Sequence, residues 1–168
     1  MDLSSERLQI RKLTSADASF ILELLNTKAF KQNIGDRNVR TIADAEDKIN
    51  NFYSTGYPTH GLFAVTLKAT GKTIGTVSYL KRDFLECDDI GYAFLPEYWG
   101  CGYAIEATAS VLNFKVSQGA IRILGVVNSD NLASIKLLEK LGFQTTGMVL
   151  MEGEEEPILK MEYNTGNN

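Results

Sequence analysis

The chain has 168 residues, of which 44% are hydrophobic and 23% charged, and its formal net charge is −4. This length and composition predict one globular domain spanning residues 1–168. The acidic balance argues weakly against nucleic acid as a direct partner, because phosphate binding favours a basic surface. No apolar run approaches the roughly 18 residues that a membrane span requires.

The N-terminus and the cysteines bear on localisation and on metals. The start, MDLSSE, lacks the basic and apolar regions of a secretory signal, so we expect a cytoplasmic protein without membrane contact. Cys87 and Cys101 are the only cysteines, they show no metal-ligand spacing, and His60 is the only histidine. We therefore expect no metal site, and free thiols rather than a disulfide.

Apolar periodicity and turn residues predict alternating strands and helices along the chain. The expected elements are a strand at 8–13, a helix at 14–27, a loop at 33–40, a helix at 41–53, strands at 61–67, 72–81 and 88–95, a helix from 102 to near 119, a strand at 121–127, a helix at 131–141, and strands at 143–151 and 156–163 joined by a turn at 152–155. Residues 164–168 are expected to form a flexible tail. This order predicts an α+β protein with a mixed sheet, in which the helix from residue 102 is a right-handed crossover.

The stretch from Pro96 to Ala104 is the most informative part of the chain. It joins an apolar strand to a helix through Gly100 and Gly102. A glycine turn before a helix leaves backbone N–H groups free to bind phosphate, and the helix dipole adds to that attraction. Alone, such glycines more often mark a simple turn. Two nucleotide-binding motifs fail, because Ile105 stands where the dinucleotide fingerprint needs a glycine and no lysine follows the turn.

A second polar segment sharpens this interpretation. Residues 128–134, NSDNLAS, end the next strand and open the next helix. With this segment the chain resembles, over residues 7–163, the GNAT superfamily of acetyl-CoA-dependent N-acetyltransferases, and within it the branch of the ribosomal-protein acetyltransferases RimJ and RimL. The likeness is carried by RLQIR at 7–11, DIGY at 89–92, WGCGYAIEA at 99–107 and EKLGF at 139–143, together with Pro96, Asn131 and Ser134.

The resemblance implies a fold and a cofactor site. The fold is a twisted, mostly antiparallel mixed sheet of about seven strands with about four helices, in which two strands splay apart to form the acetyl-CoA cleft. In the family, amides of the turn grip the diphosphate of acetyl-CoA, and the preceding strand pairs with the pantetheine arm. These cofactor-binding roles map to Tyr92, Ala93, Phe94, Trp99, Gly100, Cys101, Gly102, Tyr103, Ala104, Asn131 and Ser134. Glu97 and Cys101 depart from the residues that relatives usually carry, although both positions act through the backbone.

The resemblance also implies catalytic roles. Ser134 matches a serine thought to protonate the leaving thiolate, and Leu138 stands where many relatives carry a tyrosine acid. The amide of Phe94 or of a neighbour could stabilise the oxyanion. Asp89 matches an acidic position that would act as the base through water. Two alternatives stay open: Ser134 as a plain first-turn serine, and Asp89 as a solvated residue where its strand begins.

Together these assignments predict an N-acetyltransferase that moves the acetyl group of acetyl-CoA to a primary amine by direct attack in a ternary complex. A protein N-terminal α-amine is one candidate acceptor. The alternatives are a small-molecule amine such as a polyamine or an antibiotic, and a non-catalytic acyl-CoA-binding module. We expect a monomer or a homodimer, with residues 33–40 and 53–60 lining the acceptor site.

Overall fold

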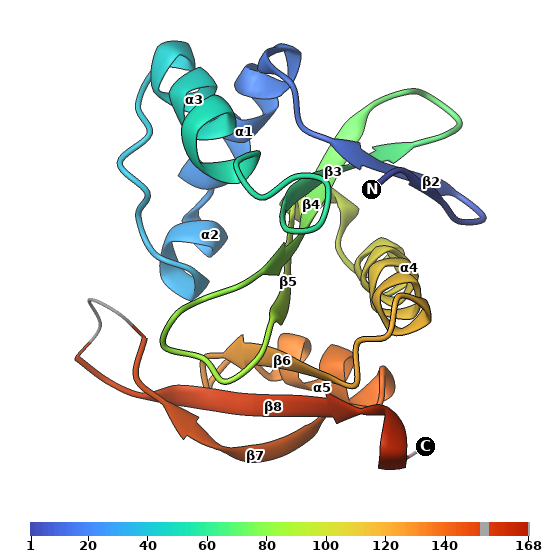
Figure 1. The fold of residues 1–168 in the computed structure, drawn as a ribbon. Coiled ribbons are helices and arrows are strands. Elements are labelled where there is room, and N and C mark those ends of the chain that lie inside the picture. The colour runs from blue at the N-terminus through green and yellow to red at the C-terminus, as the bar shows by residue number, and fades with distance from the viewer. Residues whose placement is uncertain (152–154, 168) are drawn as a thin grey trace.

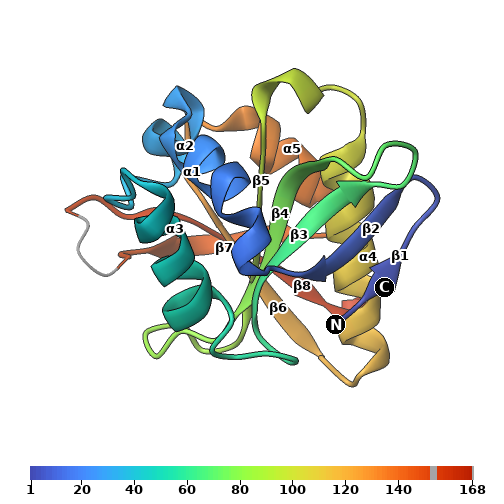
Figure 2. The same cartoon turned by 90° about the horizontal axis from the view of Figure 1, so that it is seen from above.

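The computed structural model describes residues 1–151 and 155–167, and in that part of the chain it shows one open sheet of eight strands with helices on both faces (Figures 1 and 2). The strand order is β1-β2-β3-β4-β5-β6-β8-β7. The strands are β1 Leu3–Ser4, β2 Leu8–Lys12, β3 Gly61–Leu67, β4 Thr73–Leu80, β5 Asp89–Phe94, β6 Arg122–Val127, β7 Gln144–Val149 and β8 Ile158–Asn164. The helices are α1 Ala18–Asn26, α2 Lys28–Asn33, α3 Ile42–Lys48, α4 Tyr103–Ser117 and α5 Leu132–Lys140.

The middle of the sheet splits between β5 and β6. These two strands are parallel and share a single registered pair, Asp89 with Leu124, where the Leu124 amide donates to the Asp88 carbonyl at 2.9 Å. On its other side β5 pairs with β4 along its full length, from Leu80 opposite Asp89 to Gly75 opposite Phe94. The strands therefore diverge toward their carboxyl ends, which confirms the expected splay.

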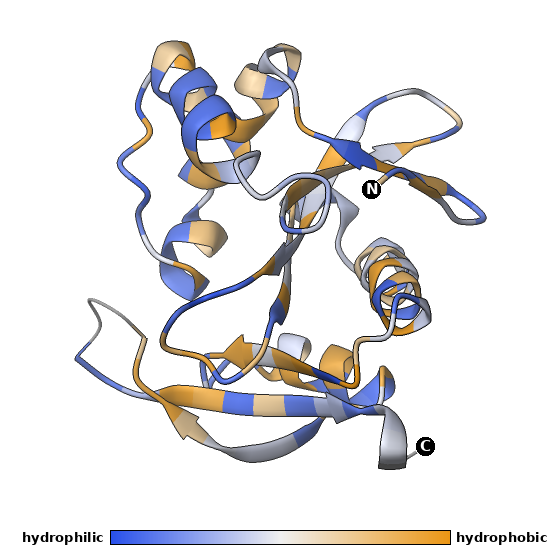
Figure 3. Ribbon diagram, in the orientation of Figure 1, coloured by the Kyte–Doolittle hydropathy of each residue, from blue (hydrophilic) through white to orange (hydrophobic). Residues whose placement is uncertain are grey.

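Two hydrophobic cores lie on opposite faces of the sheet, because side chains alternate along each strand. In β3, Phe63 and Val65 join the core that includes Val111 of α4 and Leu138 of α5, whereas Ala64 joins the core formed with α1 and α3. Figure 3 shows the same alternation of apolar and polar residues along β8. The crossover helix α4 is thereby fixed against the sheet with its N-terminus at the split.

The fold class predicted from the sequence is confirmed, with differences in the count of elements. The extra strand is β1, two residues that pair with β2. The extra helix is α2, which buries none of its residues and begins where the Thr27 side chain accepts a hydrogen bond from the Phe30 amide. The helix expected at 14–27 opens as a 3-10 turn at Ser15–Asp17, and the one expected at 41–53 ends as a π-turn at Ile49–Tyr53.

The C-terminal part closes the sheet as an antiparallel pair of β7 and β8. Most of the turn expected at 152–155 lies outside the described residues. Within the expected tail, Thr165–Asn167 forms a 3-10 turn, and the Thr165 amide donates to the Ile121 carbonyl at 3.0 Å. Among the helices in the described ranges, none combines the length and the hydropathy that a membrane span needs.

Candidate active site

The turn between β5 and α4 presents main-chain amides at a helix start. Gly100 and Gly102 adopt left-handed φ angles of 72° and 81°, which glycine tolerates where a Cβ would be strained. Gly102 is the N-cap of α4, and it has no side chain with which to cap the first amides. A Cβ at Gly100 would meet no atom within 4 Å, so the turn faces open space. A helix start of this geometry suits an anion, and the phosphate-binding role itself stays a prediction.

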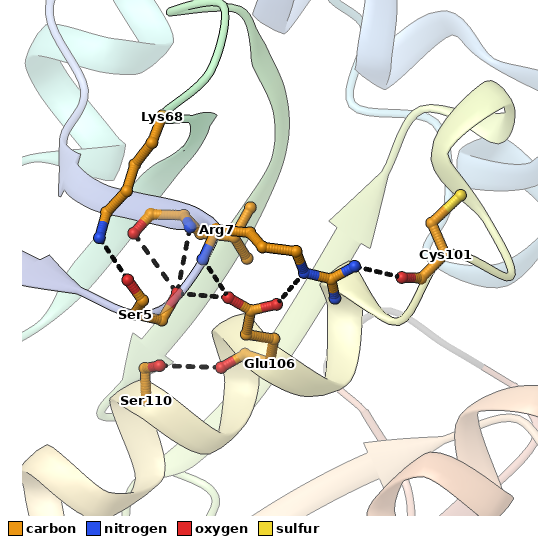
Figure 4. Close-up of polar contacts among 7 residues, drawn as sticks. Ser5, Arg7, Lys68, Cys101, Glu106 and Ser110 are labelled. Atoms are coloured by element: carbon orange, nitrogen blue, oxygen red, sulfur yellow. Dashed lines mark hydrogen bonds and ion pairs between the residues drawn. The ribbon is translucent and has the colours of Figure 1, made fainter.

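Arg7, just before β2, and Glu106, in the first turn of α4, form an ion pair beside this turn (Figure 4). Arg7 Nε donates to Glu106 Oε2 at 2.7 Å, and Arg7 Nη1 donates to the Cys101 carbonyl at 3.0 Å. Glu106 also accepts from the Ser5 hydroxyl at 2.7 Å. Burial raises the pKa of Glu106, but these hydrogen bonds outweigh it and hold the pKa below its usual value. The carboxyl is thus kept ionised beside its arginine.

The amides of β5 that face the split are set by the pairing of β5 with β4. The Leu95 amide donates to the Ile74 carbonyl of β4 at 3.0 Å. Because main-chain groups alternate between the two sides of an antiparallel strand, the Ala93 groups also face β4, while those of Tyr92 and Phe94 face β6. Since Asp89 and Leu124 are the only registered pair of β5 and β6, the amides of Tyr92 and Phe94 face the split without a paired β6 residue. Of the three β5 residues expected to bind pantetheine, Tyr92 and Phe94 present their main chain to the split and Ala93 does not.

Trp99 covers the end of this strand. Its indole Nε1 donates to the Phe94 carbonyl at 2.9 Å, although the residue is 55% exposed. The indole thereby binds the Phe94 carbonyl, one of the main-chain groups that face the split. It does not bind the Phe94 amide, which faces the same side. This side-chain contact joins two predicted cofactor-binding residues.

Tyr92 and Ser134 meet across the split. The Tyr92 hydroxyl on β5 donates to Ser134 Oγ on α5 at 2.9 Å. Asn131, the N-cap of α5, accepts from the Ser134 amide at 3.2 Å and so fixes the first turn of that helix. Burial raises the pKa of Tyr92, while its hydrogen bond to Ser134 acts in the opposite direction, and the net shift is upward. The phenol therefore stays protonated at neutral pH. The sequence signalled Asn131 and Ser134 but not the Tyr92 hydroxyl.

Asp89 lies at the closed end of the split. It is 1% exposed, and it accepts from Arg82 Nε at 2.7 Å and from Arg82 Nη2 at 3.3 Å. Burial raises the pKa of Asp89, Arg82 opposes the shift, and the net direction is upward. Five residues of strand, roughly 17 Å, separate it from Phe94. The structure thus brings Asp89 together with Arg82 rather than with Ser134, and it rules out a solvated position for this carboxyl.

A second polar cluster lies on the α4 side of the same closed end. His60 Nε2 is 3.0 Å from Asp88 Oδ2, and the imidazole stacks on Tyr79 with 5.5 Å between ring centres. The Lys115 ammonium lies 4.2 Å from the centre of the Tyr79 ring and donates to the Thr59 carbonyl. Burial lowers the pKa of Lys115, and the nearby Asp88 carboxylate opposes that shift. The cluster ties the loop before β3 to the start of β5.

A sheet divided between two parallel strands, with a glycine turn and a helix start beside the division, is the arrangement that the sequence resemblance implies for an acetyl-CoA-dependent acetyltransferase. The family described as the acetyltransferase (GNAT) domain matches residues 7–144. The uncharacterized N-acetyltransferase YoaA of Bacillus subtilis (strain 168) is 31% identical over 151 residues, which are 88% of this chain and 85% of YoaA. The chain therefore belongs to the GNAT family, and it is an acetyltransferase.

Solved structures of varied acetyltransferases share the fold. The ribosomal-protein-S5-alanine acetyltransferase of Vibrio fischeri superposes with a TM-score of 0.73 at 22% identity, covering 98% of this chain and 96% of that one. The aminoglycoside acetyltransferase AAC(6')-Ib, in complex with coenzyme A, gives a TM-score of 0.74 at 19% identity, with 95% of each chain covered. At these identities the likeness establishes the fold and leaves the acceptor open.

Proposed function

We propose that this protein transfers the acetyl group of acetyl-CoA to a primary amine by direct attack within a ternary complex. The observation that carries the proposal is the pairing of two features at one place: the glycine turn that opens α4, and the β5 amides that face the split. A diphosphate suits the first, and the amide-rich pantetheine arm suits the second, because it can pair with β5 as an added strand would. Open space at Gly100 leaves room for the phosphates.

The cofactor-binding residues divide into two groups in this proposal. The main chain of Trp99, Gly100, Cys101, Gly102, Tyr103 and Ala104 holds the diphosphate, and Tyr92 and Phe94 pair with the pantetheine arm, Phe94 through its amide at the thioester end of that arm. Ala93 supports them through β4, where it lies opposite Thr76. Asn131 orders the first turn of α5 through the Ser134 amide.

Acetyl transfer requires a hydrogen-bond donor for the oxyanion and a proton for the departing thiolate. The Phe94 amide supplies the first, since it points into the cleft from a strand fixed along β4. Ser134 supplies the second. Its oxygen already accepts the Tyr92 hydrogen, and a serine hydroxyl carries one hydrogen of its own, so that hydrogen is free to point at another acceptor. Because a thiolate with a pKa near 8.5 is a tolerable leaving group, this acid assists without being indispensable.

The incoming amine must lose a proton before or during attack. Asp89 is 1% exposed and held by Arg82 at the closed end of the split, so it cannot take the proton directly, and in this proposal a chain of several waters carries the proton to it. A protein N-terminal α-amine, with a pKa of about 8, needs less help than a lysine-like amine at about 10.4. We therefore propose the α-amine as the first acceptor class. The fold shared with an aminoglycoside acetyltransferase makes a small-molecule amine the second.

The proposal is tested by measuring release of CoA thiol from acetyl-CoA with a panel of acceptors: N-terminal peptides, polyamines and aminoglycosides. We expect acceptor-dependent release with at least one class, following ternary-complex rather than ping-pong kinetics. Calorimetric titration with CoA in the same buffer separates the outcomes. Binding without release for every acceptor would indicate the non-catalytic module, and absence of binding would refute the proposed site.

A further inference from the structure

Arg7 connects the β1–β2 turn to the start of α4, 99 residues further along the chain (Figure 4). Besides its bonds to Glu106 and the Cys101 carbonyl, its guanidinium carbon lies 4.5 Å from the centre of the Tyr103 ring. Its Nη2 would stand 3.2 Å from a Cβ built on Gly102. One side chain thus contacts three residues, Cys101, Tyr103 and Glu106, and lies beside Gly102.

The backbone of Arg7 is itself fixed. Its amide donates to Glu106 Oε1 at 2.8 Å, and its carbonyl accepts from the Lys68 amide at 3.0 Å. The Lys68 ammonium also donates to the Ser5 carbonyl. The guanidinium therefore extends from a rigid corner of the sheet, and it can transmit that rigidity to the turn it contacts.

The bond from Arg7 to Cys101 sets the direction of one amide. In a trans peptide unit the C=O and the following N–H point in opposite directions. Since the Cys101 carbonyl points at Arg7, the Gly102 amide points away from Arg7. Loss of this bond would free the Cys101–Gly102 peptide to rotate, because glycine accepts many backbone conformations.

The charge of Arg7 is already balanced. Glu106 lies in the first turn of α4, where an unpaired carboxylate would repel a diphosphate. The ion pair at 2.7 Å cancels that repulsion. Because the pair is neutral as a whole and the Gly102 amide points the other way, Arg7 influences a bound anion through the turn rather than by touching it.

We propose that Arg7 is a positioning residue for the diphosphate of acetyl-CoA, which holds the Cys101 carbonyl and neutralises Glu106 so that the Gly102 amide faces the ligand. The inference rests on the proposed function, and it names a residue outside the glycine turn on which the diphosphate part of that site depends.

The test uses R7K and R7Q in the full chain, with R122K as a matched control. Arg122 pairs with Glu162 at 2.7 Å with side-chain exposures of 40% and 15%, against 2.7 Å with 43% and 16% for Arg7 and Glu106. Lysine keeps the charge but has one nitrogen where arginine uses two to hold Glu106 and Cys101, and it lacks the plane that lies over Tyr103. We expect R7K and R7Q each to raise the calorimetric Kd for CoA about tenfold, and R122K by less than about twofold.

An acetyl donor that lacks the diphosphate distinguishes lost positioning of the diphosphate from general damage to the active site. With S-acetylpantetheine as donor, we expect kcat/KM of the Arg7 variants to match the wild type within about twofold. Circular dichroism and thermal unfolding establish that each variant is folded, and R7K carries the test if R7Q does not fold. Wild-type CoA affinity in R7K, or an equal loss with S-acetylpantetheine, would overturn the proposal while leaving the proposed function intact. A wild-type protein that binds no CoA would overturn both.

Discussion

Replacing Gly100 with alanine is the sharpest single perturbation of the turn. A Cβ at this position meets no protein atom within 4 Å, so Gly100→Ala makes no clash within the chain. Its backbone φ of 72° still imposes the left-handed conformation on an L-residue, at a cost of about 1 kcal/mol of folding stability. The new methyl group would occupy the open side of the turn, where we place the diphosphate.

The expected loss of affinity follows from the hydrogen bonds at stake. Displacing the diphosphate enough to break one hydrogen bond from a main-chain amide to a charged phosphate oxygen costs about 1.5–3 kcal/mol. This corresponds to about a 10- to 100-fold increase in the Kd for CoA. Gly119 provides the matched control. It also has a left-handed φ, 94°, and open surroundings, and it follows the far end of α4, about 22 Å from the turn.

The assay is calorimetric titration of both variants with CoA, alongside urea unfolding. We expect Gly100→Ala and Gly119→Ala to lose similar stability, while Gly100→Ala alone loses affinity. Equal CoA affinity in the two variants would refute the assignment of the turn to the diphosphate, because backbone strain would then be the only consequence of the new methyl group.

Two further predictions concern the proton chain and the pH dependence of folding. Ser134→Ala should lower kcat about 10- to 100-fold, with the KM for acetyl-CoA changed less than about threefold. Tyr92→Phe should lower kcat by a smaller factor, because Ser134 remains. Undiminished kcat of both variants in steady-state kinetics would remove the pair from the mechanism. Asp17→Asn should cost about 2 kcal/mol at about pH 7. Burial raises the pKa of Asp17, but hydrogen bonds from Arg11 and from Thr14 lower it by more than burial raises it. The net pKa therefore lies below its usual value. The stability from this carboxylate is therefore full above the ordinary carboxyl pKa of about 3.9 and is lost as pH falls through the lowered one, so urea unfolding should show the gap between the two proteins narrowing as pH falls below the ordinary value. A gap that stays constant with pH would contradict the contribution of the ion pair.

The parts of the fold that sequence predicted are those with a local physical cause. Gly100 and Gly102 signalled the turn because left-handed backbone favours glycine, and the apolar stripe containing Ala107 and Val111 signalled α4. The helix α2 gave no such signal, because it is six residues long and buries none of them. Its beginning depends on the Thr27 cap, a contact that many loops share.

The parts of the site that sequence missed depend on long-range contacts. Tyr92 and Ser134 are 42 residues apart, and Arg7 and Glu106 are 99 apart, so no spacing along the chain relates them. The partner of Asp89 is only seven residues away, yet the pairing with Arg82 depends on how the chain reverses between β4 and β5. Backbone roles could therefore be placed from motifs, whereas side-chain partners required the fold.

The central claim is that main-chain amides of the β5–α4 turn, and of β5 before it, bind acetyl-CoA. Titrating ¹⁵N-labelled protein with CoA and following each amide resonance tests it most directly. We predict the largest shifts at Gly100, Gly102 and Tyr103, with a second group at Tyr92 and Phe94, and little change at the far end of α4. Saturable shifts confined to other parts of the sheet, with these five amides unmoved, would contradict the account.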